Sequence, residues 1–163
     1  MTLQELDLVA DIDLGAEISA AIETKDSEKL NAIFEPMAMS DGLRELLELT
    51  VDDRSLVLTL LSAELAAALI EEAPHEMGAD LMEDLEPTRA FALLEEMDSD
   101  VQANLIGDMD DEEAEAILSQ MDASDAADMR RLSEYESDTA GGLMMSELFT
   151  FKNTQTVGAV LKE

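Results

Sequence analysis

The sequence from residue 63 to residue 134 divides into six blocks of twelve residues, AELAAALIEEAP (63–74), HEMGADLMEDLE (75–86), PTRAFALLEEMD (87–98), SDVQANLIGDMD (99–110), DEEAEAILSQMD (111–122) and ASDAADMRRLSE (123–134). The seventh position of every block is apolar, the eighth and eleventh are apolar in all blocks but the last, and the fourth is mostly small. Positions four, seven, eight and eleven share one face of an α-helix. Each block therefore predicts a short amphipathic helix that ends at a polar residue or proline.

A helix of two to two and a half turns is marginal on its own and must bury its apolar stripe against neighbours. We therefore predict an all-α fold, a right-handed-type superhelix of short amphipathic helices stacked one on the next. Met97, Met109 and Met121 recur at the eleventh position of successive blocks. This spacing favours a role as adaptable core residues over a binding groove.

The segment before the blocks predicts further helices. Residues 3–14 carry apolar positions interrupted by three aspartates and are expected to form a frayed leader. A first helix is expected over about 14–24. A second is expected to begin at a cap at Ser27 and to end before Pro36. Two more are expected, one capped by Ser40 or Asp41 and the other by Asp52 or Asp53. The aspartates between later blocks are expected to lie at helix starts, near unpaired N–H groups and the positive end of the helix dipole.

The pattern changes near Tyr135. Gly141 and Gly142 break the helical pattern, residues 148–151 alternate like a short strand, and a helix is expected from Val157. A strand and half a helix cannot bury a core. We therefore divide the chain into a helical domain over residues 1–134 and, over residues 135–163, a linker with the start of a second domain that is cut off.

The charge of the chain limits its partners. Among 163 residues, 40 are acidic and 9 are basic, giving a formal net charge of -31. This excess disfavours nucleic acid and anionic membranes, because few basic groups are present to neutralise phosphates. It favours cations, either as counterions or as bound divalent metal, or a basic partner surface. A purely solubilising role for most carboxylates is the alternative.

Several classes of function lack their signatures. There is no cysteine, which excludes disulfides and thiolate chemistry. His75 is the only histidine and is interpreted as a surface residue rather than a zinc ligand. No nucleophile or phosphate-loop motif is present, so we predict that the chain is not an enzyme. No signal peptide or membrane-spanning run is found, and we expect a soluble, cytosolic chain with no direct membrane insertion.

Carboxylates crowd two of the block boundaries. Asp98 and Asp100 flank one boundary, and Asp108, Asp110 and Asp111 surround the next. Hard divalent ions prefer such oxygen ligands, and Mg²⁺ typically keeps several waters and takes one or two carboxylates. We therefore name these five aspartates as candidate metal ligands and Mg²⁺ as the candidate ion, in weak sites shared with another surface. Helix capping or simple solvation is the alternative for each of them.

The chain resembles the cytosolic N-terminal region of MgtE-type magnesium transporters. In that family a superhelix of short helices leads through a motif like Y-x-x-D-x-A-G-G-L-M into a CBS domain, and here Tyr135, Asp138, Ala140 and the residues 141–144 (GGLM) match it. The stretch VLTLL over 57–61 is also similar to the family. The resemblance covers essentially the whole chain and implies that residues from 143 begin a CBS domain.

The resemblance implies a regulatory role. Asp100 matches a family carboxylate that helps to bind Mg²⁺ against the CBS domain, whereas two further acidic positions of the family fall on Asn104 and Ala68. Mg²⁺ would bridge the acidic domain to the CBS domains and hold a transporter dimer closed, and at low Mg²⁺ repulsion would release it. The implied partners are the CBS and transmembrane domains of the same homodimeric transporter, at the cytoplasmic face of the inner membrane.

Two other functions remain open from the residues alone. One is a helical protein–protein module like the flagellar motor switch protein, which has similar helical repeats. It would predict a charged, torque-bearing helix and no AGGLM segment. The other is an acidic scaffold that senses no metal, whose charge only keeps it in solution.

Overall fold

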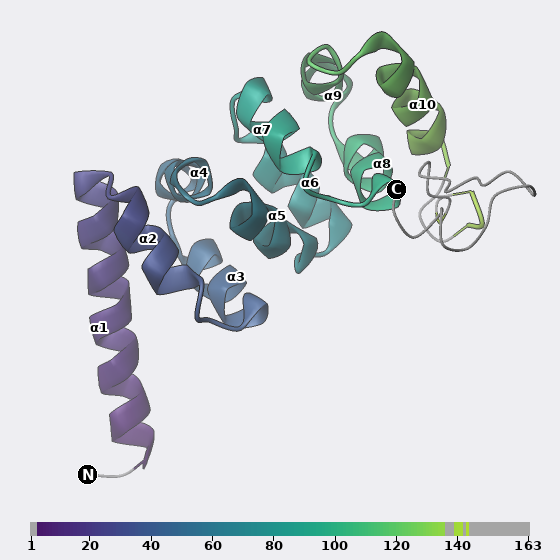
Figure 1. Cartoon of the computed structure of the whole chain (residues 1–163). Helices are drawn as coiled ribbons and strands as arrows, with labels where there is room; N and C mark the ends of the chain where they lie inside the picture. Colours follow the sequence, from purple (N-terminus) through teal and green to yellow (C-terminus); the bar gives the residue numbers. More distant parts are fainter. Residues whose placement is uncertain (1–2, 136–138, 142, 144–163) are drawn as a thin grey trace, which may run out of the picture.

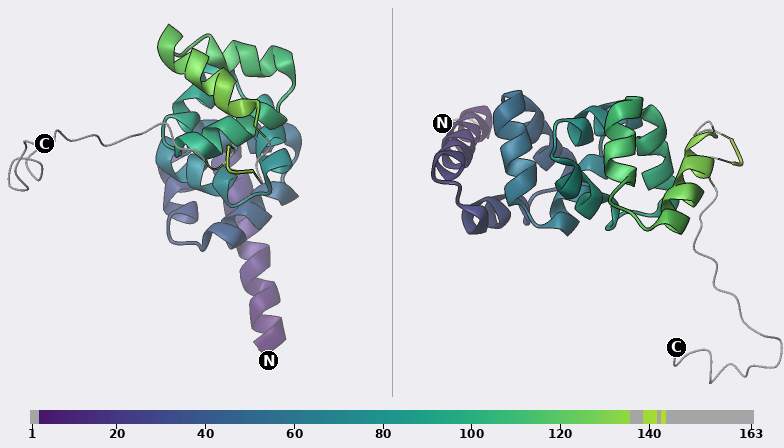
Figure 2. Two further views of the ribbon diagram at one scale, coloured as in Figure 1. Left: turned by 90° about the vertical axis from the view of Figure 1, so that its right-hand side faces the viewer. Right: turned by 90° about the horizontal axis from the view of Figure 1, so that it is seen from above.

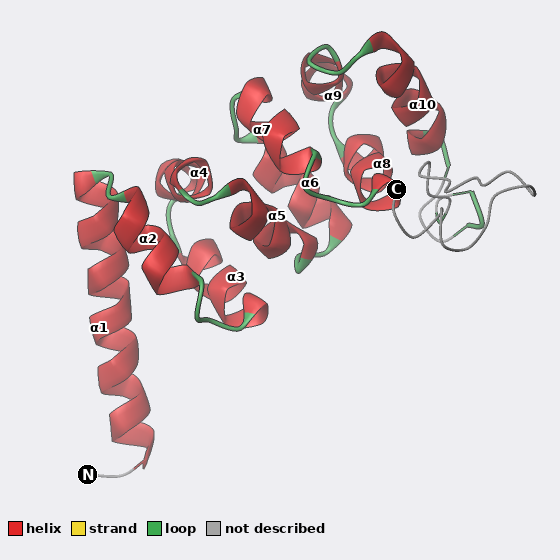
Figure 3. Cartoon of the chain, viewed as in Figure 1, coloured by secondary structure: helices red, strands yellow, loops and turns green. Residues whose placement is uncertain are grey.

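The chain is described by a computed structural model that covers residues 3–135, 139–141 and 143, with side chains from residue 14 onward. Within these residues the structure is helical and contains no strand (Figures 1 and 3). The helices are α1 (Leu3–Thr24), α2 (Ser27–Phe34), α3 (Met39–Glu48), α4 (Val51–Leu60), α5 (Ala63–Glu71), α6 (His75–Glu83), α7 (Pro87–Leu94), α8 (Ser99–Asp108), α9 (Asp111–Leu118) and α10 (Ala123–Ser133). The predicted all-α fold of short helices is confirmed.

The twelve-residue period sets where the helices begin. Each of α5 to α10 starts at the first residue of one sequence block. The seventh positions of all six blocks are buried, from Leu69 in α5 to Met129 in α10. Met97 and Met109 are also buried, and Met121 is half-buried against the core. The predicted apolar stripe is therefore the core-facing side of every block, and the methionines are core residues.

The short helices stack in two columns. In the repeated part of the chain the main contacts are to the next-but-one helix, so α3, α5, α7 and α9 form one column and α6, α8 and α10 form a second. Figures 1 and 2 show the helices following one another along an elongated array from α1 to α10. Breaks of two to four residues between helices reverse the chain at every step, which carries consecutive helices to opposite columns. The predicted stack of short helices is confirmed; consecutive helices such as α5 and α6 also contact each other, but less extensively than next-but-one helices do.

The N-terminal part requires further corrections. Residues 3–14 are not a frayed leader, because one continuous helix, α1, runs over Leu3–Thr24 and its first turns project from the array (Figure 1). Helix-favouring Leu, Gln, Glu and Ala residues outweigh the irregular stripe in this segment. The N-cap of α2 is Asp26, whose side chain accepts a hydrogen bond from the Lys29 N–H, and not Ser27.

The caps of the next two helices also lie one or more residues before the predicted ones. Helix α3 has Ala38 at its N-cap, in place of Ser40 or Asp41. Helix α4 is capped by Thr50, whose hydroxyl accepts from the Asp53 N–H at 3.2 Å. Threonine is also a preferred N-cap residue, and the aspartates then occupy the first turn, where the helix dipole favours them.

Polar bonds join the helices across the loops. The Arg89 guanidinium of α7 donates to the carbonyl of Leu58 at 3.1 and 2.7 Å and to that of Leu61 at 2.7 Å. These carbonyls belong to the C-terminal end of α4, which has no further helical turn to satisfy them. Asn31 similarly accepts from the Ser62 N–H at 2.9 Å. The loops are thus held by side chains from other helices.

The C-terminal end of the array depends on a close approach of two helices. A Cβ on Gly107 of α8 would lie 2.9 Å from the carbonyl oxygen of Ser133 in α10, so only glycine fits there without displacement. Gly141 likewise lies against the ring of Tyr135, which follows the end of α10. The predicted strand over 148–151 and helix from Val157 lie outside the described residues. No described helix combines the length and apolarity needed to cross a bilayer.

Candidate cation-binding surface

The five aspartates predicted as metal ligands lie at opposite ends of α8. Asp98 is the N-cap of α8 and Asp100 lies in its first turn, whereas Asp108 is its last residue. Asp110 and Asp111 begin α9. The ten residues of α8 span about 15 Å at the usual helical rise. The structure therefore separates the predicted set into two groups that cannot share one ion.

The boundary aspartates occupy the expected positions without making the expected bonds. Asp98, Asp110 and Asp122 are the N-cap residues of α8, α9 and α10, but none of their side chains accepts a capping hydrogen bond. All three are exposed. Their carboxylates still lie close to the positive ends of helix dipoles. These aspartates therefore lie at the N-cap positions that the capping interpretation predicts. Their carboxylate oxygens, however, accept no hydrogen bond from the backbone N–H groups of the helix start.

The first group gains a third carboxylate from another helix. Partial burial of the carboxyl of Glu71, the last residue of α5, raises its pKa, and the negative charges of Asp98 and Asp100 raise it further. The end of α5 therefore faces the start of α8. Three acidic groups repel one another here, and a cation placed among them would convert that repulsion into attraction.

Glu71 was not among the residues named from the sequence. It stands at the ninth position of its block, where Glu83 and Glu95 also stand in the blocks that follow. That repetition was a usable signal. The role of the repeated glutamate depends on how the helices pack. The packing brings the end of one helix, such as α5, to the start of the third helix after it, α8.

The second group is arranged differently. Glu83, the equivalent of Glu71 in the next block, accepts a hydrogen bond through Oε1 from the Asp110 N–H at 2.7 Å. Its carboxylate thereby caps α9. Asp108 and Asp111 are exposed at the same corner. At this end of α8 the added carboxylate is bound to a backbone donor, which leaves it less available to a cation than Glu71.

The surface is acidic but open. No group of three or more Asp, Glu or His side chains in the described part of the chain is arranged closely enough to hold a metal ion by itself. A hydrated Mg²⁺ needs only one or two direct carboxylates and keeps water on its other positions. Asn104, one turn after Asp100 in α8, and Ala68 in α5 are both half-buried and add no charge. His75, the first residue of α6, is exposed as predicted.

A comparison with models of protein families identifies the family to which the chain belongs. The model of the MgtE intracellular N domain matches residues 37–138, which include α3 to α10. The chain belongs to the MgtE N-domain family. The resemblance identified from the Tyr135 motif and the helical blocks is confirmed. None of the curated proteins matches the chain.

Two solved structures are similar to this MgtE N domain. The crystal structure of the cytosolic domain of the Mg²⁺ channel MgtE in complex with ATP is 28% identical, with a TM-score of 0.66 over 80% of this chain and 54% of that one. The soluble part of a magnesium transporter is 22% identical, with a TM-score of 0.70 over 92% of this chain and 60% of that one, which shows the shared fold. The chain thus spans little more than half the length of these relatives.

Proposed function

We propose that this chain is a regulatory, Mg²⁺-sensing domain of a magnesium transporter and that its ion-responsive surface is formed by Glu71, Asp98 and Asp100. The observation that carries the proposal of Mg²⁺ sensing is the family match over residues 37–138. The raised pKa of Glu71, caused first by burial and then by the charges of Asp98 and Asp100, supports the choice of this surface. This electrostatic strain is what a bound cation relieves. The family membership supports the same ion.

The proposed mechanism is a shift between two arrangements. Without Mg²⁺, the carboxylates repel each other and any acidic surface that approaches them, so the domain stays apart from its partner. With Mg²⁺ bound between the surfaces, the closed arrangement is favoured by the difference in binding free energy between the two states. The partners are the CBS and transmembrane domains of the same transporter, in a homodimer at the cytoplasmic face of the inner membrane, where closure stops Mg²⁺ entry.

The binding free energy that Mg²⁺ sensing requires explains why the partner surface is part of the proposal. A dissociation constant of about 1 mM corresponds to about 4 kcal/mol of binding free energy. Exposed charge pairs contribute at most about 1 kcal/mol each, so three carboxylates alone fall short of that value. Ligands from the facing surface are therefore required, and ion binding is coupled to closure.

Small-angle scattering of this domain joined to a complete CBS pair, with and without Mg²⁺, tests the proposal. We expect compaction on Mg²⁺ addition in the millimolar range. The variant Glu71→Gln/Asp98→Asn/Asp100→Asn should require more Mg²⁺ for the same compaction. The variant Asp108→Asn/Asp110→Asn/Asp111→Asn removes as many charges at the other end of α8 and should change the midpoint less.

Two outcomes would overturn this assignment. Equal shifts in the two variants would mean that net charge, and not the surface at Glu71, sets the response. Absence of compaction in the unmodified protein would support the acidic scaffold. A module similar to the flagellar motor switch protein is disfavoured by the family match over residues 37–138.

A further inference from the structure

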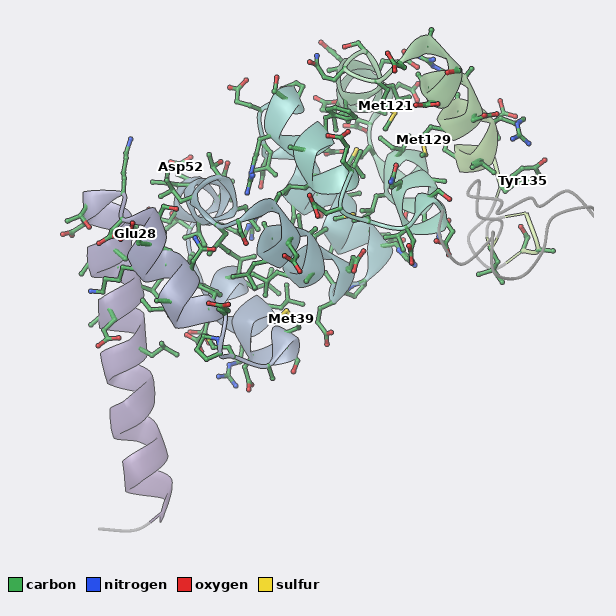
Figure 4. All side chains as sticks on the ribbon, in the orientation of Figure 1. Glu28, Met39, Asp52, Met121, Met129 and Tyr135 are labelled. Carbon is green, nitrogen blue, oxygen red and sulfur yellow. The ribbon has the colours of Figure 1, made fainter. Side chains whose placement is uncertain are left out.

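A cleft lies outside the proposed ion-responsive surface. It is bounded by α7, the start of α8, the end of α9 and α10, and it has a volume of about 520 Å³. None of Glu71, Asp98 and Asp100 lines it. Figure 4 shows two of its residues, Met121 in the turn after α9 and Met129 on α10, at this end of the array. Its volume falls within the range of small-molecule sites.

The lining of the cleft is mostly polar, but its floor carries apolar side chains. Phe91 of α7, Met121 after α9, and Met129 and Leu132 of α10 line it. Met129 and Leu132 are buried, whereas Phe91 and Met121 are half-buried and pack against the core. Thioether and aromatic side chains offer a soft surface to aliphatic groups. The floor therefore suits a ligand with methylene groups, which a bare metal ion lacks.

The rim of the cleft is acidic. Glu95 of α7 lines one side, and Asp122, Asp125 and Asp128 line the other. All four are exposed, and no basic residue lines the cleft. Asp128 is paired with Arg131 at 3.2 Å, but both side chains are more than half exposed and adjacent on α10. Such surface pairs contribute little and exchange readily for another cation.

The three rim aspartates form a row. They recur every third residue from the N-cap into the second turn of α10, so successive carboxylates are displaced by about 4.5 Å along the helix axis. This displacement is comparable to the separation of neighbouring ammonium groups in amines linked by three or four methylene carbons. The row of carboxylates and the apolar floor thus lie along the same cleft.

We infer that this cleft binds a linear aliphatic polyamine. Its ammonium groups pair with the carboxylates of Glu95 and the α10 row, and its methylene segments lie on the methionine and aromatic floor. Hydrated Mg²⁺ would use the carboxylates but gain nothing from the floor. A helical peptide needs a groove long enough for anchors over two turns. A second copy of a chain with a net charge of -31 would be repelled. The inference does not rest on the proposed Mg²⁺ response.

Methionine-methyl NMR and calorimetry on the whole chain test the inference, with spermidine as the probe. On titration at physiological salt, we expect the methyl signals of Met121 and Met129 to shift and that of Met39, at the other end of the array (Figure 4), to stay unchanged. Mg²⁺ at equal charge should not reproduce the shifts. The variant Asp125→Asn/Asp128→Asn should weaken spermidine binding about fivefold or more.

Two comparisons decide between a site and general charge attraction. The double variant Glu28→Gln/Asp52→Asn removes the same charge far from the cleft (Figure 4) and should change affinity less than about twofold. The near-isosteric Met121→Gln should weaken spermidine binding while leaving Mg²⁺ binding unaltered. Equal losses in the two double variants, or equal affinity for spermidine and a simple monoamine, would overturn the inference. Tighter binding by a lysine-rich peptide than by spermidine would overturn the polyamine as the occupant.

Discussion

Glu83, at the end of α6, caps α9 by accepting a hydrogen bond from the backbone N–H of Asp110 at 2.7 Å. Glu71 and Asp98 have the same separation in sequence, one block earlier, and there the relation is a repulsion that raises the pKa of Glu71. The same separation in sequence therefore has two outcomes. On one side of the array it stabilises a helix start, and on the other it concentrates negative charge.

Removal of the Glu83 carboxylate should weaken the start of α9. We expect Glu83→Ala to lower the free energy of unfolding by about 1–2 kcal/mol, because a charge-assisted capping bond is lost. Urea denaturation measures this difference. Glu86→Ala is the matched control, since Glu86 is the N-cap of α7 without a side-chain capping bond, and it should change stability by less than about 0.5 kcal/mol. Equal effects would show that the 2.7 Å bond carries no stability.

The charge cluster predicts a dependence on pH. The pKa of Glu71 is raised above its ordinary value of 4.5, so the folded chain holds this proton more tightly than the unfolded chain. Its contribution to stability is present below about pH 4.5 and is lost as pH rises through the raised pKa. In the presence of a chelator, Glu71→Gln should therefore be more stable than the unmodified chain at pH 7, by less than about 1 kcal/mol, and equal to it near pH 4.

Denaturation of both proteins at the two pH values checks this sign. Glu72→Gln, which removes one exposed charge from the adjacent position, should show a smaller gain at pH 7. Addition of Mg²⁺ should reduce the advantage of Glu71→Gln. A variant that is less stable than the unmodified chain at pH 7 would contradict the repulsion described at this surface.

Arg89 should be important for the junction of α4 and α5. Burial lowers the pKa of its guanidinium, which still remains protonated at neutral pH. Arg89→Met preserves much of the side-chain volume but leaves the carbonyls of Leu58 and Leu61 without their donor. We expect a loss of about 2–3 kcal/mol in the free energy of unfolding. Arg131→Met, which breaks only an exposed pair, should cost less than about 1 kcal/mol.

Two glycine variants should change stability in opposite directions. A Cβ at Gly107 would lie 2.9 Å from the backbone oxygen of Ser133, whereas a Cβ at Gly15 has nothing within 4 Å. Gly107→Ala should therefore destabilise the α8–α10 contact by about 1–3 kcal/mol. Gly15→Ala should stabilise α1 by up to about 1 kcal/mol, since alanine favours a helix more than glycine does. Thermal unfolding of both variants gives the comparison.

The period of the sequence was sufficient to predict the helix starts and the buried face, but not the order of packing. An apolar stripe specifies which side of a helix is covered and says nothing of which neighbour covers it. For this reason Asp98 and Asp100 could be assigned to one block boundary and Asp108 to the next, but the helix end that faces each boundary could not be predicted. Glu71 was missed because an exposed glutamate at the end of a helix is ordinary until the helix that it faces is known.

The caps were predicted less well than the core. Threonine, serine and aspartate cluster near several helix starts, and the choice among them depends on backbone angles that local composition does not determine. Thr50 in place of Asp52 or Asp53 is one example. By contrast, Leu69 and its equivalents could be placed in the core because each one repeats at the same block position.

Packing on the next-but-one helix also restricts how this array can change in length. Loss or gain of a single twelve-residue block would move every later helix to the opposite column and exchange the capping side with the charged side. Loss or gain of twenty-four residues would preserve the side of each later helix and the direction in which the chain leaves α10. Insertions and deletions in such an array are therefore expected to be tolerated in pairs of helices.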